Sequence, residues 1–297
     1  MNGKREGKQG AGPAFRTDLA CEAGRPCAVR RERCETVAGQ PVTVTRSREA
    51  DGGRYVTVSC GPLGEWEGDA LTALAGLLAG EMTALSALML GHPLTADTRV
   101  LVAGLGNAAI TPDALGPGTV SRMTVTRHLR QTRRELYEAL GCCELSALAP
   151  GVLGQTGIEA ALLIRQAADT AGAELIVAVD ALAARSVSRL AATIQLSDTG
   201  LSPGAGIGNR RMTLNADTAG RPVLSLGIPT VVDSGTLLYD ALTRAGMDAD
   251  SLPASVGQVL ESGRTYIVTP RDCDAVNERS CMLLSRALDM AYGIERG

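Results

Sequence analysis

Lysine and histidine are scarce in this chain, and each scarcity excludes a class of function. Lysine occurs only at Lys4 and Lys8, so the rest of the sequence offers none for a phosphate-binding P-loop, a Schiff base or a lysine-linked cofactor. The two histidines, His92 and His128, leave little material for a histidine-rich metal site or a Ser-His-Asp triad. We therefore expect any catalysis to depend on carboxylates.

Aromatic residues and excess positive charge are also lacking. Phe, Tyr and Trp make up 2% of the residues, and 29 basic residues face 32 acidic ones, which gives a net charge of -3. Binding to nucleic acid usually needs a cationic surface or aromatic side chains on which bases stack. The composition therefore predicts that the protein does not bind nucleic acid directly.

No segment is typical of export or of a membrane anchor. Residues 1–12 are polar and glycine-rich, unlike a secretory signal, and the eight cysteines form no Cys-x-x-Cys pair. Residues 70–91 are long enough to cross a membrane, but Glu81 lies near their centre and many of the others are small. We interpret this stretch as a buried helix and predict a reduced, cytoplasmic protein that does not insert into a membrane.

The 297 residues, 45% of them apolar, can form a sizeable core. From Arg99 onward, short apolar runs alternate with stretches of helical pattern such as 158–171 and 272–292, which predicts an α/β fold with helices on the faces of a mixed sheet. The expected strands are 100–103, 175–179, 192–196, 229–232 and 265–268.

The N-terminal part has a different character. Residues 1–18 lack apolar periodicity and are predicted to be a flexible arm, followed by one domain over 19–297. Two β-branched runs, 42–45 and 55–58, flank the turn sequence Asp51-Gly52-Gly53. This pattern predicts a small peripheral β hairpin near residues 42–60.

Acidic residues follow two of the predicted strands. The run 100–103 leads through Gly104-Leu105-Gly106-Asn107 to Asp113, and the run 175–179 ends on Asp180. The carboxyl ends of strands converge on one crevice in such sheets, so we expect these two carboxylates to share a cleft and divide the roles of general base and general acid. The alternative interpretation is that each aspartate only caps the helix that follows it.

Other motifs support weaker hypotheses. Gly104-Leu105-Gly106 lacks the third glycine of a dinucleotide site, and Asp198-Thr199-Gly200 occurs once, whereas pepsin-like proteases are all-β and need two copies. Cys142-Cys143 is expected to pack in the core. The loop 203–209 is either a tight structural turn or a place where backbone amides approach a ligand or an oxyanion, through Gly204, Gly206 and Gly208.

Several of these motifs together resemble the germination protease family of endospore-forming bacteria, in order and spacing as well as in residue identity. The resemblance extends with gaps from Arg16 to about Pro270. The motifs are Phe15-Arg16-Thr17-Asp18-Leu19-Ala20, Gly104-Leu105-Gly106-Asn107, Thr111-Pro112-Asp113-Ala114-Leu115-Gly116-Pro117, 150–157 (PGVLGQTG), 179–186 (VDALAARS) and 227–233 (GIPTVVD).

The resemblance implies an endopeptidase that begins the degradation of small acid-soluble spore proteins during germination. It implies a fold like that of hydrogenase maturation proteases (phosphorylase/hydrolase-like), a homotetramer, and a location in the cytoplasm of the forespore or spore core. The family's catalytic aspartates fall on Asp113 and Asp180. Oxyanion stabilisation is expected from the loop containing Gly104, Gly106 and Asn107, or from the loop 204–209, where Ala205 replaces a common serine.

Two carboxylates without histidine or cysteine make a weak transition-metal site, so we expect no metal or other cofactor. Two alternatives remain. One is a maturation-type protease that trims the C-terminal tail of a metalloenzyme and binds a metal through the same acids. The other is a non-catalytic binding protein in which both aspartates are helix caps.

Residues 17–22 (TDLACE) resemble the family's substrate motif, an acid followed by a bulky apolar residue, alanine, a small residue and glutamate. The resemblance implies a zymogen that removes residues 1–18 by its own cut between Asp18 and Leu19. The alternative is that these residues are an ordinary polar arm.

Overall fold

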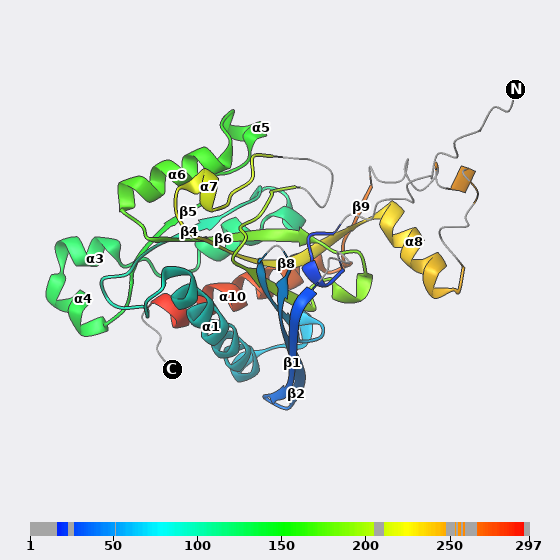
Figure 1. The fold of residues 1–297 in the computed structure, drawn as a ribbon, viewed down its shortest axis with the longest axis horizontal. Helices are drawn as coiled ribbons and strands as arrows, with labels where there is room; N and C mark the ends of the chain where they lie inside the picture. The colour runs from blue at the N-terminus through cyan, green and yellow to red at the C-terminus, as the bar shows by residue number, and fades with distance from the viewer. Residues whose placement is uncertain are drawn as a thin grey trace, which may run out of the picture.

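The computed structural model describes residues 17–22, 27–50, 52–204, 211–247 and 266–293, together with residues 253, 255, 256 and 258. Within these ranges the strands form one nine-stranded sheet in the order β1-β2-β3-β7-β8-β6-β4-β5, with β9 paired to β8 (Figure 1). The strands are β1 (Cys27–Val37), β2 (Gln40–Glu49), β3 (Arg54–Ser59), β4 (Arg99–Gly104), β5 (Glu144–Leu148), β6 (Leu175–Ala183), β7 (Thr193–Ser197), β8 (Val223–Asp233) and β9 (Ile267–Val268).

The sheet is mixed, which confirms the predicted α/β class. Strands β5, β4, β6 and β8 pair parallel with one another, whereas β1, β2, β3 and β7 pair antiparallel and both β7 and β9 pair antiparallel with β8. Helices cover both faces of the parallel part, and β6 is buried along nearly its whole length. Burial on both faces explains why this strand is a continuous apolar run in the sequence.

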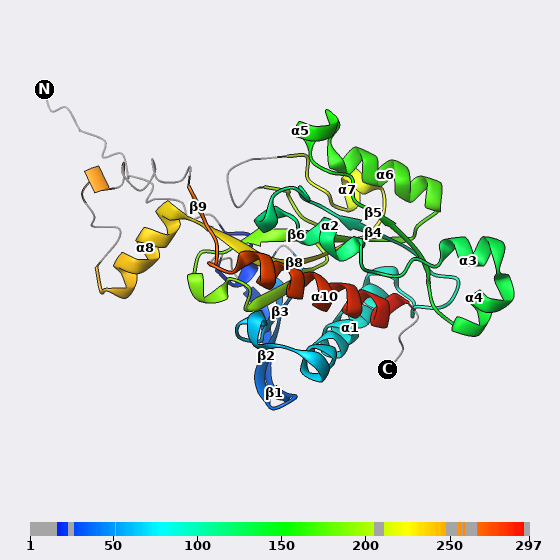
Figure 2. The same ribbon diagram turned by 180° about the vertical axis from the view of Figure 1, so that it is seen from behind.

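Helices α6 and α7 lie on one face of the parallel strands, and α1, α2 and α10 lie on the other (Figure 2). The short helices α3 and α4 precede β5 and α8 follows β8, and Figure 1 shows these two groups of helices on opposite sides of the molecule. The α-helices are α1 (Gly68–Leu90), α2 (Leu115–Val120), α3 (Arg127–Thr132), α4 (Arg134–Leu140), α5 (Leu153–Thr156), α6 (Ala160–Ala171), α7 (Ala216–Ala219), α8 (Ser234–Arg244) and α10 (Cys273–Tyr292). The 3-10 turns are η1 (Ala20–Glu22), η2 (Leu63–Glu65), η3 (Thr111–Asp113) and η4 (Val187–Arg189).

Helix α1 passes a length and composition test for a membrane span, yet it packs in the protein core. It lies against α10, where the hydroxyl groups of Ser86 and Tyr292 are 2.6 Å apart. Its buried Glu81 is paired with Arg46 of β2, whose Nε donates a hydrogen bond of 2.8 Å. This pairing explains how a carboxylate is accommodated in an apolar helix.

Three sequence interpretations change in the structure. Strand β6 continues past residue 179 to Ala183, because the long strand β8 pairs with it as far as Ala183 opposite Val231. The hairpin of β2 and β3 extends the main sheet through the pairing of β3 with β7. Strand β1 is not among the expected strands, because its residues are mostly exposed and form no apolar pattern; its long antiparallel pairing with β2 holds it in the sheet.

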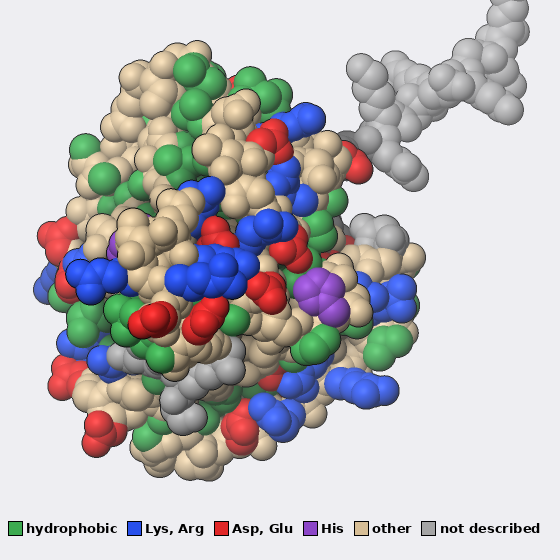
Figure 3. All heavy atoms as spheres, turned by 90° about the vertical axis from the view of Figure 1, so that its left-hand side faces the viewer, with side chains coloured by type: hydrophobic (Ala, Val, Ile, Leu, Met, Phe, Trp, Pro, Cys, Tyr) green, Lys and Arg blue, Asp and Glu red, His purple; other side chains and the backbone are tan. Residues whose placement is uncertain are grey.

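The surface around α3 and α4 carries basic and acidic side chains in alternation, as Figure 3 shows. Arg130 lies 2.8 Å from Asp97 and 2.9 Å from Glu144, and Arg127 lies 3.3 Å from Glu144. The arginine-rich stretch around His128 is therefore largely neutralised by neighbouring carboxylates.

Candidate active site

Asp113 lies in η3, immediately after the loop that leaves β4. The backbone N–H of Asn107 donates a hydrogen bond of 2.8 Å to Oδ2 of Asp113. Gly106 has a φ of +112°, and a Cβ atom there would lie 2.0 Å from the carbonyl oxygen of Asp113. Only glycine therefore allows the loop to pass this close to η3. On the other side, the Thr230 hydroxyl donates to the carbonyl oxygen of Pro112 at 2.6 Å, so η3 is held from both β4 and β8.

Asp180 lies inside β6, in a row of paired residues that crosses three strands. Gly227 of β8 is opposite Asp180, and Gln195 of β7 is opposite Gly227. Residues paired in this way project from the same face of a sheet. Asp180 and Gln195 therefore face the same space, with no side chain between them, and both are buried.

Neither aspartate caps a helix. Helix α2 begins at Leu115 after Ala114 and has no side-chain cap, while the Asp113 carboxylate is bound by Asn107. Strand β6 continues beyond Asp180, whose Oδ1 accepts the N–H of Ala181 at 2.9 Å. The helix-cap interpretation, and with it the version of the binding-protein alternative that depends on it, is wrong.

The structure brings Asp113 and Asp180 to the same cavity, which has a volume of about 530 Å³. A second cavity, of about 310 Å³, is lined by Leu19, Gln195 and Gly227. Asp18 and Asp180 line both cavities. Asp18 therefore lies beside the candidate carboxylates.

The surroundings of Asp113 and Asp180 raise the pKa values of both carboxyl groups. Burial raises the pKa of Asp180 well above that of an exposed aspartate, and the charges of Asp113 and Asp18 raise this pKa further. Burial also raises the pKa of Asp113, partly offset by the hydrogen bond from Asn107. Neighbouring carboxyl groups of this kind favour holding a shared proton, which is the state in which one acts as an acid and the other as a base.

Residues 17–22, named here the N-terminal segment, are bound tightly to the end of β6. The Asp18 N–H donates to the Ala183 carbonyl oxygen at 2.9 Å, and the Ala183 N–H donates to Oδ2 of Asp18 at 2.8 Å. Leu19 is completely buried among apolar side chains that include Leu182 and Val232. The segment is thus held on both sides of the peptide bond between Asp18 and Leu19.

Gln195 is the residue of this site that sequence reasoning missed. Its Nε2 donates to the carbonyl oxygen of Asp18 at 3.0 Å, and its Oε1 accepts the N–H of Ala20 at 2.7 Å. The only signal in the sequence is a polar residue inside the otherwise mostly apolar run 192–196. The side chain acts as a clamp on the peptide bonds that flank Leu19.

The predicted loop residues divide into three groups. Gly106, Asn107 and Gly204 line the larger cavity, although the N–H of Asn107 is already donated to Asp113. Gly104 faces the backbone of Gly116, where a Cβ atom would lie 2.3 Å from the carbonyl oxygen. The remaining predicted positions, Gly206, Gly208 and the neighbouring Ala205, lie outside the described residues.

The other motifs considered in the sequence are Asp198-Thr199-Gly200 and Cys142-Cys143, and their contacts are those of structural residues. Asp198 forms an ion pair of 2.8 Å with Arg54 and also accepts the Arg54 N–H, so it joins the end of β7 to β3. Cys142 and Cys143 are buried. In the part of the chain that the structure describes, no three His, Cys, Asp or Glu side chains are arranged to hold a metal ion.

The fold and the site define an α/β protein in which one buried carboxyl group, that of Asp180, and one half-buried carboxyl group, that of Asp113, line a cavity beside a bound peptide segment. The family model for germination protease matches residues 30–245. The chain is 35% identical to a germination protease of Caldanaerobacter subterraneus over 280 residues, which cover 88% of this chain and 81% of the relative. It is 33% identical to that of a Geobacillus strain (91% and 80% covered) and 38% identical to that of Bacillus velezensis (78% and 64% covered). The chain belongs to the germination protease family and is a peptidase.

Proposed function

We propose that this chain is an endopeptidase that degrades small acid-soluble spore proteins during germination and is made as a zymogen. The observation that carries the proposal is the placement of the Asp18–Leu19 bond. Its carbonyl oxygen is bound by Gln195, its flanking residues are fixed by β6 and by the Leu19 pocket, and Asp18 lines both cavities beside Asp180. The chain thus holds its own segment as a peptidase holds a substrate.

Asp113 and Asp180 supply the acid and base in this proposal. Ionised Asp113 takes a proton from a water molecule, whose oxygen attacks the carbonyl carbon of the bound peptide. Protonated Asp180, whose pKa is raised the more strongly, gives its proton to the leaving nitrogen as the C–N bond breaks. Gln195 donates a hydrogen bond to the oxygen on which negative charge develops.

The proposal includes the features that the family resemblance implies beyond the reaction. These are the fold of hydrogenase maturation proteases, removal of residues 1–18 by self-cleavage, a homotetramer, and a location in the spore core. The donor set of the site also favours a reaction without a metal, since carboxylates alone bind transition metals weakly.

Incubation of the purified chain with a small acid-soluble spore protein tests the proposal. Wild type should digest the substrate after self-cleavage, while Asp113→Asn and Asp180→Asn should each lose nearly all activity and remain folded, because an amide neither takes the water's proton nor gives one to the leaving nitrogen. Near wild-type turnover by either folded variant would contradict the aspartate pair. Loss of cleavage with a chelator, restored by a metal ion, would favour the maturation-type alternative.

A further inference from the structure

Three large apolar side chains are exposed at the cavity that Asp113 lines. Ile110 is 51% exposed, Met212 39% and Ile267 47%, and all three line this cavity of about 530 Å³. They come from the loop before η3, from the start of the range 211–247 and from β9, so the fold gathers them from distant parts of the chain. Exposed apolar side chains that converge on one cavity indicate a binding surface.

The surface that these side chains form with two neighbouring ones is named here the apolar pocket, and its members are Ile110, Val152, Leu153, Met212 and Ile267. None of the five side chains has a charge or a hydrogen-bond donor, so the pocket binds through the hydrophobic effect and through its shape. A charged side chain placed against them would lose hydration without gaining a partner from the pocket. The pocket therefore favours a large apolar group as its ligand.

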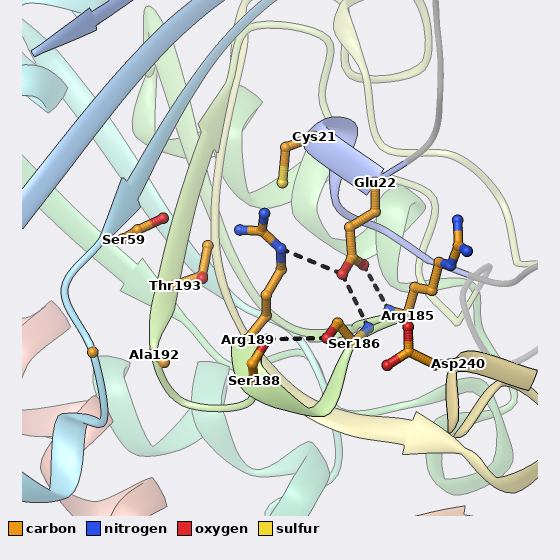
Figure 4. A pocket seen from close by; sticks show the side chains of 11 residues that line it. Cys21, Glu22, Ser59, Arg185, Ser186, Ser188, Arg189, Ala192, Thr193 and Asp240 are labelled. Carbon is orange, nitrogen blue, oxygen red and sulfur yellow. Dashed lines mark hydrogen bonds and ion pairs between the residues drawn. The ribbon is translucent and has the colours of Figure 1, made fainter. Parts of the chain in front are cut away.

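The residues after the Asp18–Leu19 bond are bound on other surfaces. Leu19 is buried in a separate cluster that includes Leu182. The Glu22 carboxylate lies beside the Arg189 guanidinium, with 3.4 Å between Oε1 and Nε, as Figure 4 shows. Asp18 is the one residue of the N-terminal segment that lines the cavity with the apolar pocket. The pocket is therefore left to residues that precede the cut bond.

The sequence before the N-terminal segment supplies one large apolar side chain close to the cut. Thr17 lines the smaller cavity, and its hydroxyl group donates to the Glu22 carboxylate at 2.6 Å. Residues 1–16 lie outside the described residues, and apart from the first residue their one large apolar member is Phe15. Phe15 precedes Asp18 by three residues, and three residues of extended chain span about 10 Å. That length is comparable to the width of a space of about 530 Å³.

We infer that the apolar pocket is a substrate-binding subsite for a large apolar side chain at the fourth position before the bond that is cut. Within this chain its ligand is Phe15, with Asp18 counted as the first position. The inference rests on the proposed cleavage between Asp18 and Leu19. It adds a determinant on the N-terminal side of the cut, where the resemblance of residues 17–22 to the family's substrate motif specifies only the acid.

Three peptides with the sequence of residues 12–24 test the pocket. One is unchanged, one carries Phe15→Ala, and one carries Ala14→Phe together with Phe15→Ala, which moves the phenylalanine by one position at constant composition. Self-cleaved wild type should cut the unchanged peptide with a kcat/KM about tenfold higher or more than either altered peptide, because the side chain reaches the pocket in one register only.

A double variant of the enzyme, Met212→Ser with Ile267→Ser, removes part of the pocket and leaves both aspartates in place. It should cut the unchanged peptide about tenfold more slowly than wild type, but it should cut the Phe15→Ala peptide at the wild-type rate, since that peptide does not use the pocket. Leu162→Ser changes an exposed leucine of α6 that does not line the cavity. This matched control should cut all three peptides as wild type does.

The outcomes separate the pocket from the proposed function. Equal kcat/KM values for the unchanged peptide and either altered one would overturn the pocket and leave the proposed function intact. A double variant that slows the unchanged and the Phe15→Ala peptides by the same factor would do the same. A wild-type chain that cuts neither itself nor any peptide would overturn the proposed function and the pocket with it.

Discussion

Gln195 binds the peptide bonds on both sides of Leu19: its Nε2 donates to the Asp18 carbonyl oxygen and its Oε1 accepts the Ala20 N–H. We expect Gln195→Glu to slow self-cleavage about 100-fold to 1,000-fold, because an ionised glutamate cannot donate to the developing oxyanion. The rate is measured by mass spectrometry of timed samples. Gln166→Glu, the same change at an exposed position of α6, is the control and should cleave normally. Cleavage at the wild-type rate by Gln195→Glu would exclude this role.

Asp180 also makes stability depend on pH. Its pKa is higher in the folded chain than the unfolded value of about 4, so the folded state binds the proton more tightly. The free energy of unfolding contributed by this group is therefore greatest below about pH 4 and decreases as the pH rises towards the folded pKa. Above that pKa the folded chain carries a buried charge.

Asp180→Asn removes this charge, so the variant should have a higher Tm than wild type near pH 7. An increase of a few degrees is expected, since 1 kcal/mol corresponds to roughly 2–4 °C for a domain of 150–250 residues. The difference should shrink towards pH 4, where wild type is protonated. Thermal unfolding followed by circular dichroism at both pH values measures it, and a Tm difference independent of pH would contradict the burial argument.

At the scale of elements, the site depends on the row of paired residues across β6, β8 and β7. Gly227 occupies the middle position, where a Cβ atom would lie 2.8 Å from the carbonyl oxygen of Asp180 and 2.6 Å from Cγ of Leu182. The absence of a side chain leaves the space in which the Asp18–Leu19 bond lies. The geometry of the candidate site therefore depends on the close pairing of these strands.

Gly227→Ala should lower the free energy of unfolding by about 1–3 kcal/mol, because the backbone oxygen of Asp180 cannot move aside easily. It should also slow self-cleavage by forcing Asp180 and Gln195 apart. Urea unfolding and the cleavage assay measure the two effects. Gly80→Ala in α1 has open space around its Cβ position and should be neutral or stabilising. Equal behaviour of the two variants would show that Gly227 is not needed for close packing.

At the scale of the whole molecule, the N-terminal segment brings a further carboxyl group, that of Asp18, to the candidate active site. Asp18 contributes negative charge beside Asp180, and the two share both cavities. Because the pKa values of Asp113 and Asp180 are both raised, mild acid favours the state in which these two carboxyl groups share a proton.

We expect the full-length chain to cut itself when the pH is lowered from neutral to mildly acidic, with a product that begins at Leu19. Mass spectrometry and N-terminal sequencing identify the product. Asp180→Asn should remain full length under the same conditions. Equal trimming of that variant, or a full-length wild type that already digests its substrate, would contradict the zymogen proposal.

The sequence by itself determined the α/β class, most of the buried strands and the expectation that Asp113 and Asp180 lie at one cavity, although Asp180 proves to lie inside β6 and Asp113 in η3. These follow from local patterns, since burial on both faces requires apolar runs and parallel strands bring their carboxyl ends together. It also indicated that residues 17–22 resemble a substrate.

Only the tertiary structure decided how the segment is held. Gln195 lies on β7 and Glu22 binds residues 185–189, far apart in the chain, and the pairing of β7 with β8 and β6 brings them to the same peptide. A buried polar side chain such as Gln195 can either pack inside the protein or bind a peptide. Which of the two it does depends on the strand that lies beside it. That pairing is a property of the whole sheet, and no local pattern in the sequence specifies it.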